Sequence, residues 1–273
     1  MDYPTLGDRM KAYEARGEFH LLPGVPVIAR LDGRAFHTFT KNLERPYDKR
    51  LSDLMIATAK FMAEQTQADI AYTQSDEITL AWHPIDLGSH FNGRIVKMAS
   101  VMASQATAFF NQNNPFTEQA SLCPHFDCRV WNVPNASEAI NVLIWRELDA
   151  TKNSIFSAAN SFYSHKELLN KKGDEMQEML FQKGVNWNNY PAFFKRGTYI
   201  KRTEIVRKFT AEELAALPEK HNARSDPDAV YTRSEYRVMD WPPILKMLDD
   251  AKTSGIGKQA KEVFFFSKIG EEK

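Results

Sequence analysis

Hydrophobic residues switch between strand-like and helix-like spacing over the first half of the chain. Short apolar runs such as 25–31 are typical of buried strands, whereas apolar residues three or four positions apart, as over 51–62, are typical of helices. In chain order the pattern predicts a strand, a helix, two strands, a helix and a strand over 25–31, 51–62, 70–73, 78–82, 91–111 and 126–133. This is the order of the ferredoxin-like βαββαβ unit, so we expect an α+β fold with an antiparallel four-stranded sheet and two helices on one face.

The second half of the chain is predicted to be mainly helical, with short strands. Helices are expected over 136–163 (continuous or broken near 151–154), 166–183, 210–217 and 241–252, short strands over 197–202 and 204–209, and a polar loop over 219–232. The aromatic run 264–266 is expected to pack against the body or another subunit. We therefore divide the chain into two regions, 1–135 and 136–273, packed as one unit.

Composition narrows the classes of protein. The 273 residues include 35 Lys+Arg and 35 Asp+Glu, so the chain is not a globally basic nucleic-acid binder and any RNA contact must be local. No apolar run approaches the ~18 residues that span a bilayer, and the first residues do not resemble a signal peptide. We therefore expect a cytoplasmic protein without membrane contact. Cys123 and Cys128 are too few for a disulfide framework and are expected to be reduced thiols.

Three carboxylates lie where the predicted strands end. Asp32 follows the first strand, and Asp76 and Glu77 lie in the hairpin between the second and third strands. In a ferredoxin-like sheet the first and third strands are neighbours, so these carboxylates should meet at one edge. Such a site suits Mg²⁺, and two Mg²⁺ ions can clamp the attacking and leaving oxygens of a phosphoryl transfer. The alternative is that Asp32-Gly33 and Asp76-Glu77 are ordinary turns, which Asp and Gly favour for local reasons.

Residues near these carboxylates are suited to phosphate. The carbonyl of Gly33 could complete a metal shell because glycine lets the backbone approach a ligand, and Arg34 and His37 could contact phosphate, although a solvated loop is an equal alternative. Arg45, Ser75 and Lys97 are also phosphate-suited, since Arg forms a fork for phosphate oxygens and Lys is a point charge.

A basic segment in the second half is a candidate RNA contact. Six positive side chains fall within fourteen residues, namely Lys195, Arg196, Lys201, Arg202, Arg207 and Lys208. On alternating strand positions they could follow a phosphate backbone, and the alternative is a solvated strand face. A second candidate set is Arg146, Lys152 and Asn153.

Several segments, in this order, resemble the histidine-tRNA guanylyltransferase superfamily. They are 30–37 (RLDGRAFH), 45–48 (RPYD), 72–77 (YTQSDE), 97–105, 126–129 (FDCR), 145–146 (WR) and 196–198 (RGT). The resemblance covers about residues 5–205. No single segment is specific, but the ordered set is.

The resemblance implies a polymerase-palm fold over 1–135 and a reverse polymerase that adds nucleotides to the 5′ end of RNA. It implies that Asp32 and Asp76 hold two Mg²⁺ ions with the Gly33 carbonyl, that Glu77 supports this catalytic site, and that ATP and other nucleoside triphosphates are substrates. The nucleotide-binding residues implied are Arg30, Gly33, Arg34, Ala35, Phe36, His37, Arg45, Asp48, Ser75 and Lys97. It also implies tRNA as partner, a homotetramer, and a C-terminal region that contributes tRNA and oligomer contacts.

In such proteins ATP first adenylylates a 5′-monophosphate end, and the 3′-hydroxyl of an incoming nucleotide then displaces AMP. Thr151 stands where eukaryotic members carry a motif His, and 45–48 also differs from the eukaryotic form. Both features resemble bacterial and archaeal members, which repair 5′-truncated tRNA using a template. Three alternatives remain: guanylyl addition restricted to histidine tRNA, a nucleotidyl cyclase on the same palm, and a non-catalytic RNA-binding module.

Overall fold

The computed structural model describes residues 5–226, 228–253 and 265–266. Its centre is an antiparallel sheet with the strand order β4-β1-β3-β2-β5-β6. The strands are β1 (Val27–Arg34), β2 (Ile70–Gln74), β3 (Glu77–Trp82), β4 (His125–Asn132), β5 (Thr198–Lys208) and β6 (Val230–Met239). The first four strands have the ferredoxin-like order, which confirms the prediction for this part of the fold.

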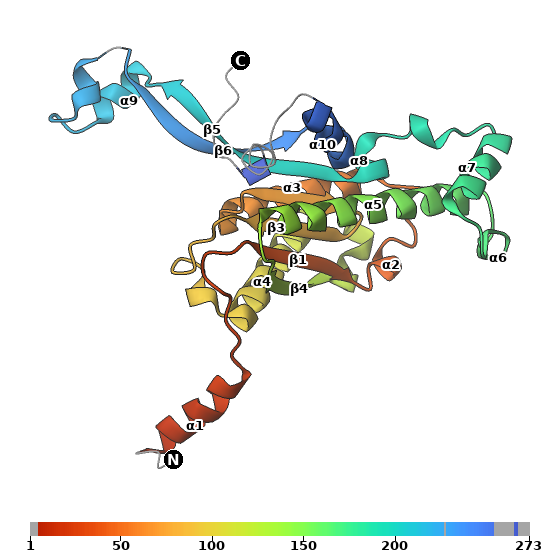
Figure 1. Ribbon diagram of the computed structural model, residues 1–273, viewed down its shortest axis with the longest axis horizontal. Helices are drawn as coiled ribbons and strands as arrows, with labels where there is room; N and C mark the ends of the chain where they lie inside the picture. Colours follow the sequence, from red (N-terminus) through yellow and green to blue (C-terminus); the bar gives the residue numbers. More distant parts are fainter. Residues whose placement is uncertain (1–4, 227, 254–264, 267–273) are drawn as a thin grey trace.

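Helices cover both faces of the sheet (Figure 1). One face of β1, with Ala29 and Leu31, packs with α3 (Lys49–Thr66) and α4 (Ile95–Gln112). The opposite face, with Ile28, packs against the long helix α5 (Ala136–Asn160). Because successive strand residues point to opposite faces, every strand residue in register with Ile28 lies on the α5 side.

The second half of the chain extends the same sheet, which the sequence did not predict. β5 pairs with β2 and with β6, and beyond the body the β5–β6 pair continues as a projecting ribbon tipped by α9 (Ala211–Ala216) (Figure 1). The predicted strands 197–202 and 204–209 are therefore one strand, and the predicted loop 219–232 contains the start of β6. An exposed ribbon needs no hydrophobic alternation because each strand satisfies the backbone of the other, so the polar sequence conceals it.

One helix prediction is confirmed in its continuous form, and another needs correction. α5 runs unbroken through 151–154, where the hydroxyls of Thr151 and Ser154 bond back to helix carbonyls and leave the backbone helical. The predicted helix 166–183 is two helices, α6 (His165–Leu168) and α7 (Gly173–Gln182), because Leu169 adopts an extended conformation between them.

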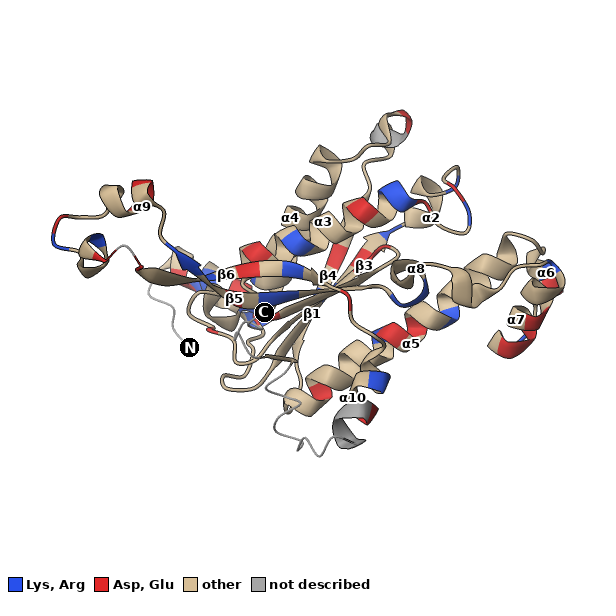
Figure 2. Ribbon diagram, turned by 90° about the horizontal axis from the view of Figure 1, so that it is seen from above, with Lys and Arg blue, Asp and Glu red and all other residues tan. Residues whose placement is uncertain are grey.

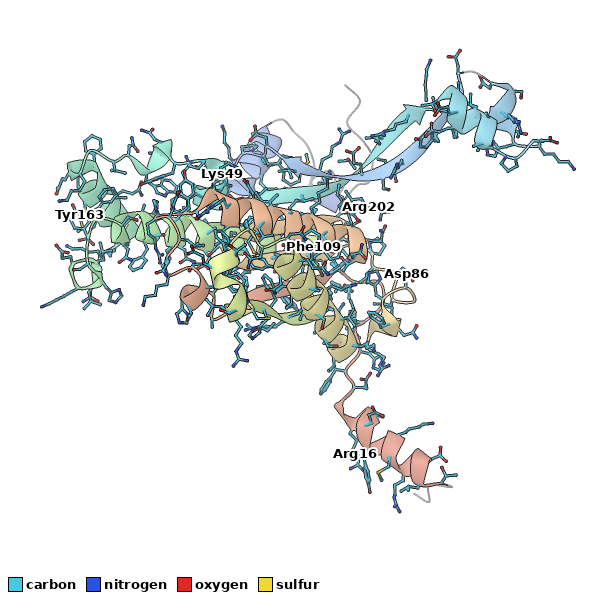
Figure 3. The ribbon with its side chains drawn as sticks, turned by 180° about the vertical axis from the view of Figure 1, so that it is seen from behind. Arg16, Lys49, Asp86, Phe109, Tyr163 and Arg202 are labelled. Carbon is cyan, nitrogen blue, oxygen red and sulfur yellow. The ribbon has the colours of Figure 1, made fainter. Side chains whose placement is uncertain are left out.

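The remaining elements lie at the periphery. They are α1 (Leu6–Glu14), α2 (Phe36–Phe39), α8 (Ala192–Arg196) and α10 (Ile244–Thr253), with 3-10 turns at Ala15–Gly17, Phe91–Gly93, Thr117–Leu122, Trp187–Asn189 and Asn222–Ser225. α1 stands clear of the body (Figures 1 and 3). Phe265 and Phe266 are buried in the α5-side core, as predicted, whereas Phe264 lies outside the described residues. Neither cysteine forms a disulfide, and no helix of the described chain is long and apolar enough to cross a membrane.

Candidate active site

Two of the predicted catalytic carboxylates meet at one edge of the sheet. Asp32 is in register with Glu77 on β3, and Asp76 lies in the tight turn that joins β2 to β3. The backbone N–H of Gly33 donates to the Asp76 carbonyl at 3.0 Å, which fixes the turn against β1. Burial raises the pKa of Asp76, and the nearby Asp32 charge raises it further. The hairpin topology thus brings Asp32 and Asp76 together as predicted.

Asp32 and Gly33 are strand residues rather than the turn considered from the sequence. β1 continues to Arg34 because β4 pairs with it that far, with Gly33 opposite Phe126. Glycine is required at position 33 for a packing reason: a Cβ there would lie 2.5 Å from the Phe36 ring. Phe36 is buried among Phe110 and Phe126, so it is a core residue under the site.

The donor set fits Mg²⁺ held jointly with a nucleotide. Within the described ranges no three His, Cys, Asp or Glu side chains are grouped to hold a metal ion. Mg²⁺ is commonly bound by one or two carboxylates and completes its shell with water and substrate phosphates. Asp32 and Asp76 supply such a pair, and a dication between them would relieve the repulsion that raises the pKa of Asp76.

Glu77 faces a different partner. Its buried carboxylate accepts two hydrogen bonds from the Arg146 guanidinium, at 2.6 and 2.8 Å, and Arg146 also binds Asp149 at 2.9 Å. Burial raises the pKa of Glu77, and Arg146 opposes that rise. Arg146 therefore anchors α5 to β3, instead of facing RNA as predicted, because its charge compensates a buried acid.

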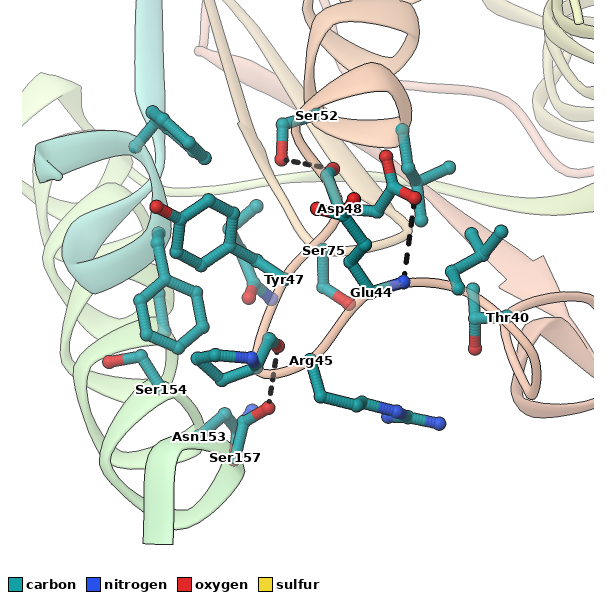
Figure 4. Close-up of a pocket in the computed structure, with 17 residues that line it drawn as sticks. Thr40, Glu44, Arg45, Tyr47, Asp48, Ser52, Ser75, Asn153, Ser154 and Ser157 are labelled. Atoms are coloured by element: carbon teal, nitrogen blue, oxygen red, sulfur yellow. Dashed lines mark hydrogen bonds between the residues drawn. The ribbon is translucent and has the colours of Figure 1, made fainter. Parts of the chain in front are cut away.

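A cavity of about 230 Å³ adjoins the Asp76 turn (Figure 4). It lies between the loop that ends in Asp48, the β2–β3 turn, α5 and α8. Predicted site residues in its lining are Arg45, Asp48, Ser75 and Asn153. Because Ser75 immediately precedes Asp76, the cavity is next in the chain to one of the two carboxylates.

The loop that forms the cavity wall is held by its own side chains. Asp48 caps α3 through Arg50 N–H at 3.0 Å, and the Arg50 guanidinium lowers the pKa of Asp48. Ser157 donates to the Pro46 carbonyl at 3.0 Å, which ties the loop to α5. Asp48 is therefore a structural residue of the site, whereas Arg45 extends away from α5 and is free to reach a ligand (Figure 4).

Sequence reasoning missed the aromatic part of this cavity. Tyr47 packs against Phe193 and Phe194, with ring centroids 5.2 and 4.9 Å apart. Tyr47 was part of a recognised motif, but its partners lie on α8, some 145 positions later in the chain, where no local pattern links them. Sequence reasoning also passed over Asp127, which pairs directly with Asp32 across β1 and β4.

The other nucleotide-binding candidates are divided between two ends of the sheet. Arg34, Ala35 and His37 are exposed just beyond Asp32, and Ala35 is in a left-handed conformation that turns the chain there. Lys97 lies instead near Glu18, at the start of α4. Phe110, which packs beneath the site, is 13 positions further along the helix, or about 20 Å at 1.5 Å per residue. Within one chain, Lys97 is not brought to the carboxylates.

The basic residues of the segment 195–208, from the end of α8 through β5, do not form one continuous exposed row. Lys201 is buried beneath Trp241, Arg196 and Arg202 are half-buried, and Arg207 at the outer end is exposed but ion-paired. Acidic side chains are interspersed along the ribbon and its tip (Figure 2). The inner half of β5 is buried because it lies between β2 and β6, which the prediction of two short strands did not anticipate. Lys152 remains exposed on α5.

Comparison with known proteins identifies the family. Residues 7–134 match the profile described as Thg1, tRNAHis guanylyltransferase. The tRNA(His) guanylyltransferase of Neurospora crassa is 31% identical over 233 residues, which span 73% of this chain and 77% of that protein. The uncharacterized protein R259 of Acanthamoeba polyphaga mimivirus is 30% identical over 227 residues, 73% of this chain and 78% of that one.

Solved structures agree with this assignment. A bacterial tRNA(His) guanylyltransferase (Thg1)-like protein in complex with ATP matches with a TM-score of 0.71 at 31% identity, over 92% of this chain and 98% of that chain. The same description applies to a GTP complex, with a TM-score of 0.68. The Saccharomyces cerevisiae enzyme matches with a TM-score of 0.60 at 27% identity, over 69% of this chain and 91% of its own. The palm-like sheet, the paired carboxylates and these relatives show that the chain belongs to the tRNAHis guanylyltransferase (Thg1) family and is a nucleotidyltransferase.

Proposed function

We propose that this nucleotidyltransferase adds nucleotides to the 5′ end of truncated tRNA in the 3′-to-5′ direction, choosing each nucleotide by pairing with the opposite strand. The observation that carries the proposal is the cavity lined by Gln74 and Ser75, the residues that immediately precede Asp76, whose carboxyl is close enough to Asp32 for the Asp32 charge to raise its pKa. A nucleotide bound there would present its phosphates to the carboxylate pair. The ATP and GTP complexes of the bacterial Thg1-like protein support nucleotides as ligands of this fold.

The chemistry would proceed in two transfers. An oxygen of the RNA 5′-monophosphate attacks the α-phosphorus of ATP, which forms an adenylylated end and releases pyrophosphate. The 3′-hydroxyl of the next nucleotide then attacks the 5′-phosphorus, and AMP leaves. Asp32 and Asp76 would hold two Mg²⁺ ions, which lower the pKa of the attacking hydroxyl and neutralise charge on the leaving group.

The chain's own residues would position the reactants. Arg45, in the lining of the cavity, and His37, just beyond the end of β1, are both exposed and would bind triphosphate oxygens. Tyr47, with its aromatic neighbours, would give the cavity an apolar wall for a base. Glu77, held by Arg146, would keep β3 and α5 in fixed register.

Two observations favour templated repair over addition restricted to histidine tRNA. Thr151 stands in place of the motif His, and its hydroxyl donates to the Glu147 carbonyl within α5 instead of presenting an imidazole. The bacterial Thg1-like structure also covers 92% of the chain, against 69% for the yeast enzyme. A homotetramer, expected from the resemblance, belongs to the same proposal.

A gel assay tests the proposal. A tRNA that lacks its first nucleotide and carries a 5′-monophosphate is incubated with the protein, Mg²⁺, ATP and each nucleoside triphosphate in turn. Extension only with the nucleotide complementary to the opposite acceptor-strand base is the expected result. Addition of G whatever the opposite base, and only to histidine tRNA, would refute templated repair. Turnover of nucleotide without RNA would indicate a cyclase.

A further inference from the structure

The register of β1 and β4 places like charges directly opposite each other. Arg30 pairs with Arg129, and two positions along, Asp32 pairs with Asp127. These residues share the face of Ile28, which packs toward α5. Opposite side chains have Cβ atoms about 4.5–5.5 Å apart, and like charges in such pairs are destabilising. We call Arg30 and Arg129 the basic row, and Asp32 and Asp127 the acidic row beside it. A ligand of opposite charge would relieve the repulsion within either row.

Arg30 has hydrogen-bonding capacity to spare. Its Nε is buried, and among the described residues it has no hydrogen-bond partner. The Oε2 of Glu77 is 3.9 Å away, too far for a hydrogen bond, and both oxygens of Glu77 accept from Arg146. Arg129, the other member of the basic row, is exposed. The basic row can therefore bind an anion that approaches from the β4 edge of the sheet, where Arg129 is exposed.

An aromatic side chain adjoins this row. Trp145, on α5, is 51% exposed, and the guanidiniums of Arg30 and Arg146 lie 5.4 and 4.6 Å from its ring. Exposed aromatic rings beside positive side chains are typical of single-stranded nucleic-acid sites, where a base stacks on the ring and the phosphate binds the cation. A nucleotide has a base that could stack on the ring of Trp145 and a phosphate that could bind the arginine side chains.

We propose that Arg30, Arg129 and Trp145 bind the 5′-terminal nucleotide of the acceptor RNA, with its phosphate on the guanidiniums and its base against the indole. Strand residues rise about 3.3 Å each, so the basic row lies about 7 Å from Asp32, and the terminal phosphate would be next to the carboxylate pair. The acidic row limits how far the phosphate can move along the strands, because the negative charge of Asp127 repels it. This inference rests on the proposed function and assigns its RNA subsite.

The test measures binding rather than turnover. Fluorescence anisotropy compares two acceptor-stem hairpin RNAs, one with a 5′-monophosphate and one with a 5′-hydroxyl, without Mg²⁺ or nucleotide. The wild-type protein should prefer the phosphorylated hairpin about tenfold or more, the usual scale for charge-assisted hydrogen bonds. Arg129→Gln should bring that ratio close to one. The matched control is Arg233→Gln, an exposed strand arginine on β6 at the far edge of the sheet, which should keep the wild-type ratio.

Trp145 supplies an independent readout. Trp145→Ala should weaken binding about fivefold or more for a hairpin with a normal terminal base and leave an abasic terminus unaffected, and Trp145→Phe should restore most of the loss. A free nucleoside triphosphate offers the same chemistry as the RNA end. If Arg129→Gln weakens ATP binding but leaves the 5′-phosphate preference intact, the RNA assignment is overturned.

Failure of the inference and failure of the proposed function can be told apart. A wild-type protein that extends truncated tRNA, and whose 5′-phosphate preference survives Arg129→Gln, would contradict only the subsite. A wild-type protein that shows neither extension nor preference would refute both.

Discussion

Arg146→Met should destabilise the protein severely, because it leaves the carboxylate of Glu77 buried without its partner. The two side chains are only 8% and 7% exposed, and two hydrogen bonds of 2.6 and 2.8 Å join them. Removing one member of a buried ion pair costs about 3–5 kcal/mol. For chains of about 150–250 residues, slightly shorter than this one, each kcal/mol of lost stability lowers Tm by ~2–4 °C, so Tm should fall by about 10 °C.

Calorimetry at pH 7.5 measures the change, and two further variants isolate its cause. Arg207→Met breaks an ion pair with Glu235 whose side chains are 52% and 37% exposed, so it should cost about 0–1 kcal/mol. The double variant Arg146→Met, Glu77→Gln removes the buried charge and should recover part of the lost stability. If Arg146→Met costs no more than Arg207→Met, the ion pair does not anchor α5 to the sheet.

Three further changes have distinct signatures. Gly33→Ala should lower stability by about 1–3 kcal/mol in urea unfolding, because its Cβ would lie 2.5 Å from the Phe36 ring; Gly17→Ala, with nothing within 4 Å, is the control, and equal effects would contradict the packing argument. Asp76→Ala should abolish nucleotide addition in the gel assay while calorimetry shows no loss of Tm, since burial and Asp32 already disfavour the charged form; wild-type addition rates would refute its catalytic role. Burial raises the pKa of Glu147 in the folded protein, so its stabilising contribution is present below the unfolded pKa of about 4.3 and is lost as pH rises through the folded pKa. Glu147→Gln should therefore gain stability relative to wild type as pH is raised from 4 to 7, and a constant difference across that range would contradict the assignment.

The inner sheet was predictable because its strands are buried. β1 and β3 are apolar on at least one full face, so their sequences reveal them, and the ferredoxin-like order then places Asp32 beside Asp76. The convergence of these two residues thus follows from topology, without any knowledge of side-chain contacts.

The rest depends on contacts between distant segments. The pairing of Arg146 with Glu77 spans 69 positions, and nothing local distinguishes a buried arginine from one that faces solvent on the same helix. β6 escaped prediction for the opposite reason: only one of its residues is fully buried, so its polar sequence resembles a loop. Hydrophobic patterns in a sequence indicate which residues are buried, but not which groups form hydrogen bonds. The Arg146–Glu77 pair is polar yet buried, and β6 is hydrogen-bonded yet largely unburied, so the pattern reveals neither.

β5 changes character along its length, and the change has a kinetic consequence. Its first four residues, from Thr198, are buried between two strands, whereas its last three, ending at Lys208, are exposed in a two-stranded ribbon. Inner amides can exchange with solvent hydrogen only when the sheet itself opens, whereas outer amides are released by local separation from β6. A single strand therefore spans two cooperative units, and its amides should divide into slowly and rapidly exchanging sets near the point where β2 ceases to pair with it.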